Sequence, residues 1–207
     1  MDKYGYVAES MVVHFDGIDK GGDSSAWTDI ISGTLKFPYS EHSAIESNCI
    51  HMDGQGSLVA SSFIPSRKSQ FEICAKNINS GTGAIYCSGR QDDNCCIVQS
   101  DGFYTCPSGW GNIVWKVNPR PDIIVMSHCG NNKPKMLNGV IYPGTNVSKS
   151  YDVKNNITTL GGRNDSDYIE CMVYSIRIYS RQLTESEVMH NQRVDNERFN
   201  MGLTFQS

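Results

Sequence analysis

The chain of 207 residues carries 18 Lys and Arg against 22 Asp and Glu, which gives a formal net charge of −4. Because basic residues are neither in excess nor clustered, a nucleic acid is excluded as the partner. The longest apolar runs, such as residues 123–126, are too short to cross a bilayer, so we also expect no insertion into a membrane. The first ten residues lack the apolar core of a signal peptide.

Short strand-like segments follow one another in the first half of the chain. The segment "SMVVHFD" places Met11, Val13 and Phe15 on one face of a strand, and residues 70–76 alternate in the same way. Gly, Asn, Asp, Ser and Pro fill the gaps between such segments. Strands at this spacing, with almost no helix between them, are typical of a β-sandwich or jelly roll.

The second half of the chain continues the pattern. The apolar runs "NIVWKV" and "DIIVMSH" are separated by "NPRPD", whose two prolines mark a turn. In "KMLNGVIY" the pair Asn138-Gly139 predicts a tight hairpin, because a type I′ turn needs positive φ at both central residues. Residues 171–179 alternate again. We therefore predict one all-β domain over residues 1–207.

One helix is predicted, at about residues 184–199. Thr184 and Glu187 have the spacing of a capping box, and Leu183 and Val188 that of a hydrophobic staple. The apolar stripe of this helix is thin, so we expect it to lie on the surface of the sandwich. Gly202 is the expected helix breaker.

The eight cysteines form no C-x-x-C pair, which argues against a zinc ribbon. Cys74 and Cys171 fall inside strand-like runs. We predict that most of the cysteines are reduced and act as small buried side chains. The alternative is a set of disulfides that involves Cys87, Cys95, Cys96 or Cys106.

The stretch "YSIRIYSRQLTESEVMHNQRVDNERF" strongly resembles the C-terminal signature of bacterial and phage LamG-like domains, in which an I-R-I-Y strand runs into an R-x-L-T-x-x-E helix start. The segment "MVVHFDGIDKGGDSSAWTDIISG" resembles the opening of the same family, with Trp27 as a core residue. These domains belong to the concanavalin A-like lectin/glucanase superfamily. The resemblance implies a jelly-roll sandwich and a broad habit of binding, since this fold hosts many functions.

A glycosidase is the less favoured alternative. Glucanases of this superfamily place carboxylates on one face of a strand through an E-x-D-x-E motif, and retaining hydrolysis needs two carboxyl groups about 5 Å apart. The chain contains no such motif, and in "NDSDYIE" Glu170 falls out of register with Asp165 and Asp167. We therefore predict that the chain is not an enzyme.

Calcium is the one cofactor considered. Relatives of the family often hold it with loop oxygens, and the candidate ligands here are Asn164, Asp165 and Asp167. A second acidic loop, "FDGIDKGGD", is better explained by turn formation, because Asp and Asn bond their own backbone. No cofactor is otherwise expected.

Glycan recognition needs an aromatic platform beside fixed polar groups, because the C–H face of a sugar packs on a ring while its hydroxyls need partners. The best local cluster is Phe103, Tyr104, Trp110 and Asn112, in a segment that matches nothing in the family. The alternative is that Trp110, between two glycines, closes a sandwich edge or a subunit contact.

Two hypotheses of function follow. The first is a non-catalytic module that binds a surface glycan or polysaccharide. The second is a structural or adhesive virion protein, such as a fibre, decoration or tail-associated subunit, because the resemblance is to phage-borne sequences. A virion lectin that forms a homo-oligomer or contacts a virion neighbour satisfies both. We expect it on a virion, or at an extracellular surface within a larger assembly. A purely structural subunit without a ligand stays open.

Overall fold

The computed structural model describes residues 1–61, 70–78, 81–88, 95–99, 102–106, 115–129, 135–142, 157–163 and 166–205. The elements in chain order are β1 (Met11–Asp16), β2 (Ala26–Thr28), β3 (Lys36–Pro38), β4 (Ser43–Ile45), β5 (Ile50–Asp53), β6 (Leu58–Ser61), β7 (Gln70–Asn77), β8 (Gly83–Ser88), β9 (Cys95–Gln99), β10 (Gly102–Cys106), β11 (Trp115–Val117), β12 (Ile123–Cys129), β13 (Lys135–Leu137), β14 (Val140–Tyr142), β15 (Ile157–Leu160), β16 (Glu170–Tyr179) and α1 (Glu185–Phe199).

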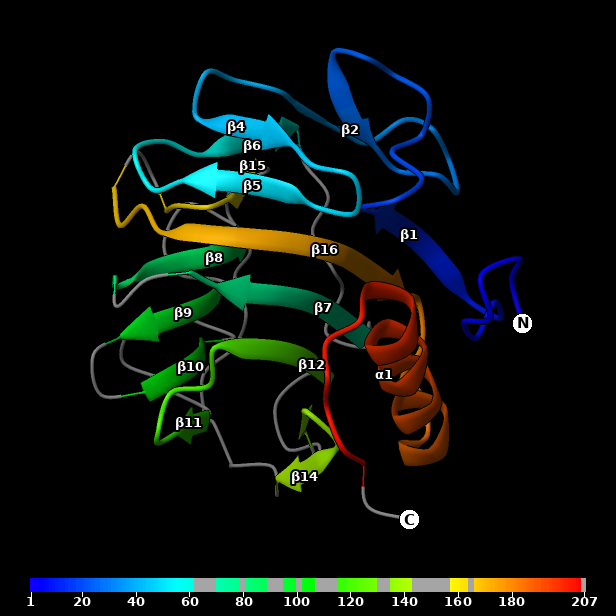
Figure 1. Ribbon diagram of the computed structural model, residues 1–207. Coiled ribbons are helices and arrows are strands. Elements are labelled where there is room, and N and C mark those ends of the chain that lie inside the picture. The colour runs from blue at the N-terminus through cyan, green and yellow to red at the C-terminus, as the bar shows by residue number, and fades with distance from the viewer. Residues whose placement is uncertain are drawn as a thin grey trace.

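Two antiparallel sheets form the body of the protein (Figure 1). The larger sheet has the order β14-β13-β12-β7-β16-β5-β4, and β1 pairs with the second half of β16 beside β5. The smaller sheet has the order β11-β10-β9-β8-β15-β6. The chain crosses repeatedly between them, for example from β6 to β7 and from β7 to β8. The predicted all-β jelly-roll sandwich is confirmed.

The main core lies between the two sheets, and the alternation of the strands explains it. Val13 and Phe15 of β1, with Ile176 and Ile178 of β16, point into it. Trp27 is fully buried there, with its ring centroid 5.3 Å from that of Phe15, and its indole N–H donates to the Asp16 carbonyl at 2.9 Å. The prediction that Trp27 is a core residue is confirmed.

Helix α1 lies on the outer face of the larger sheet, near the end of β16 (Figure 1). The Thr184 hydroxyl accepts the Glu187 amide, and the Glu187 carboxylate accepts the Thr184 amide, so the capping box is confirmed. Leu183 and Val188 are buried in one cluster, as a staple requires. The helix ends at Phe199, as predicted. Asn200 takes the left-handed conformation directly after it, with φ 54° and ψ 51°, and Gly202, the expected breaker, has a positive φ of 71° two residues later.

The contact between α1 and the sheet is ionic as well as apolar. Arg177 of β16 and Asp195 of α1 are each 1% exposed, and the guanidinium donates to both carboxylate oxygens at 2.8 and 2.6 Å. Asp195 also accepts the Tyr6 and Ser175 hydroxyls at 2.9 and 3.0 Å. Arg177 further donates to Glu72 of β7 at 3.1 Å. Such donors satisfy charges that burial would otherwise strongly disfavour.

The Asn138-Gly139 turn joins β13 to β14 as predicted, with φ of 51° and 80°. The Asn138 side chain fixes the hairpin to β12, because it accepts the Val125 amide and donates to the Ile123 carbonyl. Gln192 of α1 holds the same hairpin, since it accepts the Gly139 amide at 2.8 Å and donates to the Met136 carbonyl at 3.1 Å. Helix and hairpin are therefore held at a fixed separation.

Candidate binding pocket

A pocket of about 240 Å³ lies where the start of α1 faces the β13–β14 hairpin, over the outer face of the larger sheet. Its lining comes from five places in the chain: Gln70, Ser127, Met136, Ile141, Gln182, Leu183, Thr184, Glu185 and Val188. Because Gln192 ties the helix to the hairpin, the two walls are preformed.

The floor of the pocket is polar and the walls are apolar. Gln70 and Ser127 stand on the outer face of β7 and β12, and both are buried. The walls are Met136 and Ile141 of the hairpin on one side, and Leu183 and Val188 of the helix entry on the other. The rim is formed by the exposed residues Gln182, Thr184 and Glu185. Polar groups at the bottom of an apolar cleft can orient a small polar ligand.

The floor belongs to the buried ionic cluster. The Ser127 hydroxyl donates to Glu72 Oε1 at 2.7 Å, and Glu72 Oε2 accepts Arg177 Nε and the Asn191 amide at 3.1 and 2.9 Å. Burial raises the pKa of Glu72, an effect that the Arg177 guanidinium and the Ser127 hydroxyl oppose. Arg177 Nε and the Asn191 amide can only donate, and the adjacent guanidinium charge favours the ionised form of the Glu72 carboxylate.

A second buried titratable group, His14 of β1, lies on the same outer face of the larger sheet, where it pairs with Arg177 of β16. The His14 ring is fully buried edge-on between Tyr4 and Tyr6. Its nitrogens lie 3.8 Å from Asp2 Oδ2 and 3.6 Å from Asp16 Oδ2, and neither nitrogen makes a hydrogen bond. Burial lowers the pKa of His14 from its ordinary value of 6.5, although both carboxylates oppose the shift.

This environment predicts a pH dependence of stability. The folded pKa of His14 is depressed, so the unfolded chain binds more protons below pH 6.5 and stability falls as the pH decreases through that range. The loss reaches at most about 1.4 kcal/mol at pH 5.5. His14→Phe, which keeps an apolar ring between the tyrosines, should lose less stability than the wild type between pH 7.5 and 5.5 in urea titrations. A His14→Phe variant with the same pH slope as the wild type would contradict this prediction.

The residues predicted to bind a glycan are only partly within the described structure. Phe103 and Tyr104 lie on β10, where they pair with β9 and β11 of the smaller sheet. Trp110 and Asn112 lie outside the described residues. That site therefore stays a prediction, and the strand that carries Phe103 and Tyr104 belongs to the smaller sheet, whereas the pocket lies over the larger one.

The calcium prediction has a similar outcome. Asn164 and Asp165 lie outside the described residues, while Asp167 is exposed and pairs with Arg163 at 2.5 Å. Within the described part of the chain, no group of three or more His, Cys, Asp or Glu side chains is placed to hold a metal ion. In the "FDGIDKGGD" loop, Asp16 accepts the Ile18 and Asp19 amides, so the turn interpretation of that loop is confirmed.

The cysteines whose side chains the structure describes fall into two groups. Cys49, Cys74 and Cys171 are free and buried, and burial raises the pKa of the Cys171 thiol to about 12. Cys87 of β8 forms a disulfide, in agreement with the alternative that named it.

Among the residues that the structure describes, no helix is long and apolar enough to span a bilayer.

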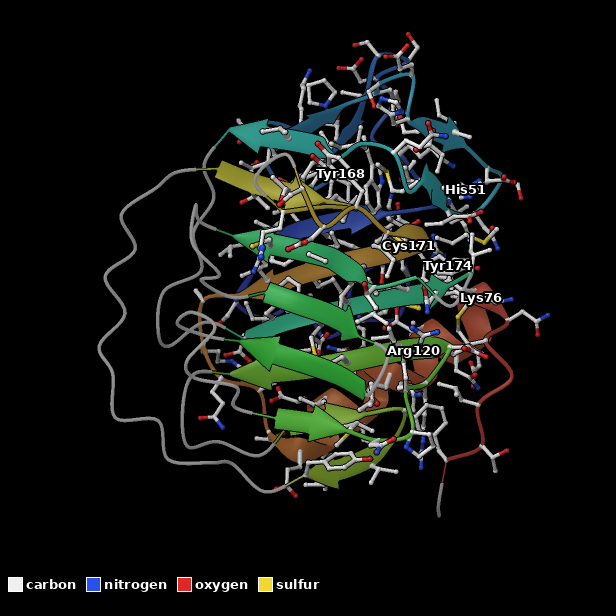
Figure 2. All side chains as sticks on the ribbon, turned by 90° about the vertical axis from the view of Figure 1, so that its left-hand side faces the viewer. His51, Lys76, Arg120, Tyr168, Cys171 and Tyr174 are labelled. Carbon is white, nitrogen blue, oxygen red and sulfur yellow. The ribbon has the colours of Figure 1, made fainter. Side chains whose placement is uncertain are left out.

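The far end of the larger sheet carries further polar side chains, but they do not converge. His51 Nε2 lies 3.5 Å from Glu170 Oε1, and Arg120 donates to the Gly81 carbonyl at 2.9 Å. Figure 2 shows His51, Lys76 and Arg120 spread one below another along this side of the sandwich. The pocket at α1 is therefore the better candidate site.

No protein-family model matches the chain, and no curated protein sequence matches it. Solved structures do. The chain is similar to the Trypanosoma rangeli sialidase in complex with sialic acid, with a TM-score of 0.66 and 10% identity over 91% of this chain. It is also similar to a point mutant of botulinum HCR/D, with a TM-score of 0.66 and 9% identity over 89% of this chain. The chain spans about a third of the length of the sialidases and about half of HCR/D.

These similarities contradict the prediction that the chain is not an enzyme. Several of the matching structures are sialidases, so the fold occurs as part of enzymes, and the missing E-x-D-x-E strand was not sufficient ground for that prediction. At 9–12% identity the likeness concerns the fold alone. What it shows is that the chain has the β-sandwich fold found within these structures.

Proposed function

We propose that this chain is a glycan-binding domain and that the pocket between α1 and the β13–β14 hairpin takes one sugar ring. The observation that carries the proposal is the composition of this pocket: a buried amide and hydroxyl, Gln70 and Ser127, beneath apolar walls. Sugar hydroxyls need fixed polar partners, while the C–H groups of the ring pack on apolar surface. A volume of about 240 Å³ suits a single ring rather than a longer chain.

The similarity of the fold to solved structures also supports the proposal. One of the matching structures is a sialidase in complex with sialic acid, so the sandwich occurs in a protein that binds a sugar. The finer assignment to the LamG-like domains is also part of this proposal. It is supported by the way β16 runs into the Thr184-capped helix.

Attachment to a virion or cell surface, and assembly into a homo-oligomer, rest on the sequence resemblance alone. Mass spectrometry of purified particles and light scattering of the isolated protein are the measurements that address them.

Ile141→Trp should abolish glycan binding, because the larger side chain fills the pocket from the hairpin side. Ile141 is 45% exposed, so the fold should tolerate the change. We expect at least about a 30-fold loss of affinity, as for an overfilled ligand site. The measurement is a glycan array with the wild type, followed by calorimetric titration of both proteins with the best ligand.

Val140→Trp is the matched control. Val140 is the neighbouring residue on β14, is 50% exposed, and points to the opposite face of the strand. It should bind the ligand as the wild type does. A failure of the wild type to bind any glycan would refute the proposed function. If the Ile141→Trp variant bound the glycan as tightly as the wild type, the binding site would not be this pocket.

A further inference from the structure

We infer that Ser127 is a specificity-determining residue of the pocket: its hydroxyl donates its hydrogen bond to Glu72, so the ligand must present a hydrogen-bond donor to the Ser127 oxygen. The inference rests on the proposed function and defines which group the sugar presents to the floor. The chemical class is a sugar with a free hydroxyl or amino group at the position that reaches β12.

The geometry begins with the two strands. Ser127 and Glu72 are direct partners in the β12–β7 register, so their side chains stand side by side on the outer face of the sheet. The Ser127 Oγ and Glu72 Oε1 lie 2.7 Å apart, and both residues are 1% exposed. A serine hydroxyl has one proton and two lone pairs. Because this one hydroxyl hydrogen is engaged with Glu72, the Ser127 oxygen can only accept a hydrogen bond from a ligand.

The direction of this hydrogen bond follows from the positive charge that Arg177 places beside Glu72. Its second oxygen accepts Arg177 Nε and the Asn191 amide, both of which are donors only at those atoms. An ionised carboxylate satisfies all three donors, whereas a protonated one would have to give its proton to Ser127. The Arg177 guanidinium is itself held by Asp195, so the positive charge beside Glu72 is permanent. Glu72 is therefore a positioning residue and Ser127 the residue that meets the ligand.

A Ser127 oxygen that can only accept a hydrogen bond distinguishes ligands that donate at this position from ligands that cannot. A hydroxyl or amino group of the sugar can donate to the Ser127 oxygen. An ether, a fluorine or a carboxylate in the same place has no proton to give and would leave that oxygen without a partner. Burial of an unpaired polar atom weakens binding more than loss of the contact itself.

Deoxyfluoro analogues of the bound sugar test this inference, because fluorine is close to hydroxyl in size and never donates. The wild type should bind all but one of the monofluoro analogues at nearly the parent affinity. The analogue substituted at the position facing Ser127 should bind about 10- to 100-fold more weakly. This part of the test uses the unaltered protein.

Ser127→Ala completes the test as a double-mutant cycle. In this variant the parent sugar and that analogue should bind with affinities within about twofold of each other. Thermal unfolding confirms that the variant is folded, and if it is not, the wild-type series alone decides. Uniform tolerance of fluorine by the wild type would overturn the inference, as would discrimination that survives in Ser127→Ala. If no sugar binds, the proposed function itself has failed.

Discussion

Asp195→Ala should destabilise the protein by about 3–5 kcal/mol, the range expected when one partner of a buried ion pair is removed. Arg177 would keep its charge but lose both of its bonds to α1, and the Tyr6 and Ser175 hydroxyls would lose their acceptor. The Tyr6 ring, 4.0 Å from the guanidinium, is only a partial substitute. Urea unfolding followed by circular dichroism measures the effect.

Glu197→Ala is the matched control, because Glu197 is an exposed acid on the same helix, two residues further on. Its change in stability should stay within about 0.5 kcal/mol. Equal stabilities of the two variants would show that the cluster under α1 does not hold the helix to the sheet.

Trp27→Ala should destabilise the protein by about 3–5 kcal/mol as well, for an apolar reason. The indole is fully buried against Phe15 and Phe37, with ring centroids 5.3 and 6.4 Å away. Its removal leaves a cavity between β1 and the β2–β3 hairpin, where Trp27 pairs with Phe37. Thermal or urea unfolding measures the loss.

Trp27→Phe separates packing from hydrogen bonding. The smaller ring keeps most of the apolar contact but leaves the Asp16 carbonyl without the indole donor. We expect a loss of about 1–3 kcal/mol, clearly smaller than for alanine. If the two variants were equally unstable, the hydrogen bond rather than the packing would dominate at this position.

The strands and the helix start could be predicted because their determinants are local. Alternation placed Val13 and Phe15 on one face, and the Thr184–Glu187 spacing defined the first turn of α1. The helix end at Phe199 was also predicted, but the residue that caps it was not. Asn200 takes the left-handed conformation directly after Phe199, before Gly202, whose φ is also positive. The Leu203 amide donates to the Asn196 side chain just beyond this turn.

The burial of the outer face of β7 could not be predicted from the sequence pattern. Gln70, Glu72 and Cys74 alternate with the core residues, which is typical of a solvent face, and all three are buried. Helix α1 covers this face: Asn191, a polar residue in the apolar stripe of the helix, donates to Glu72, and Phe199 packs in the same cluster as Cys74. The burial of a polar strand face under a polar helix face cannot be predicted from either segment alone.

The candidate pocket could not be predicted for the same reason. Its floor comes from β7 and β12 and its walls from the β13–β14 hairpin and the helix entry, so the lining residues extend from Gln70 to Val188 along the chain. Neither Gln70 nor Ser127 stands in a motif. Their role follows only from the strand pairing that brings Ser127 beside Glu72.

Chemical-shift mapping of the bound sugar tests the central claim most directly, because the candidate pocket lies over the larger sheet and strand β10, with Phe103 and Tyr104, belongs to the smaller one. Titration of ¹⁵N-labelled protein with the best ligand from the array should shift the amides of Ser127, Ile141 and Thr184. Strands β9 and β10 should stay unchanged. Shifts confined to β10 and its neighbours, with Ser127 and Thr184 unmoved, would contradict the assignment of the pocket.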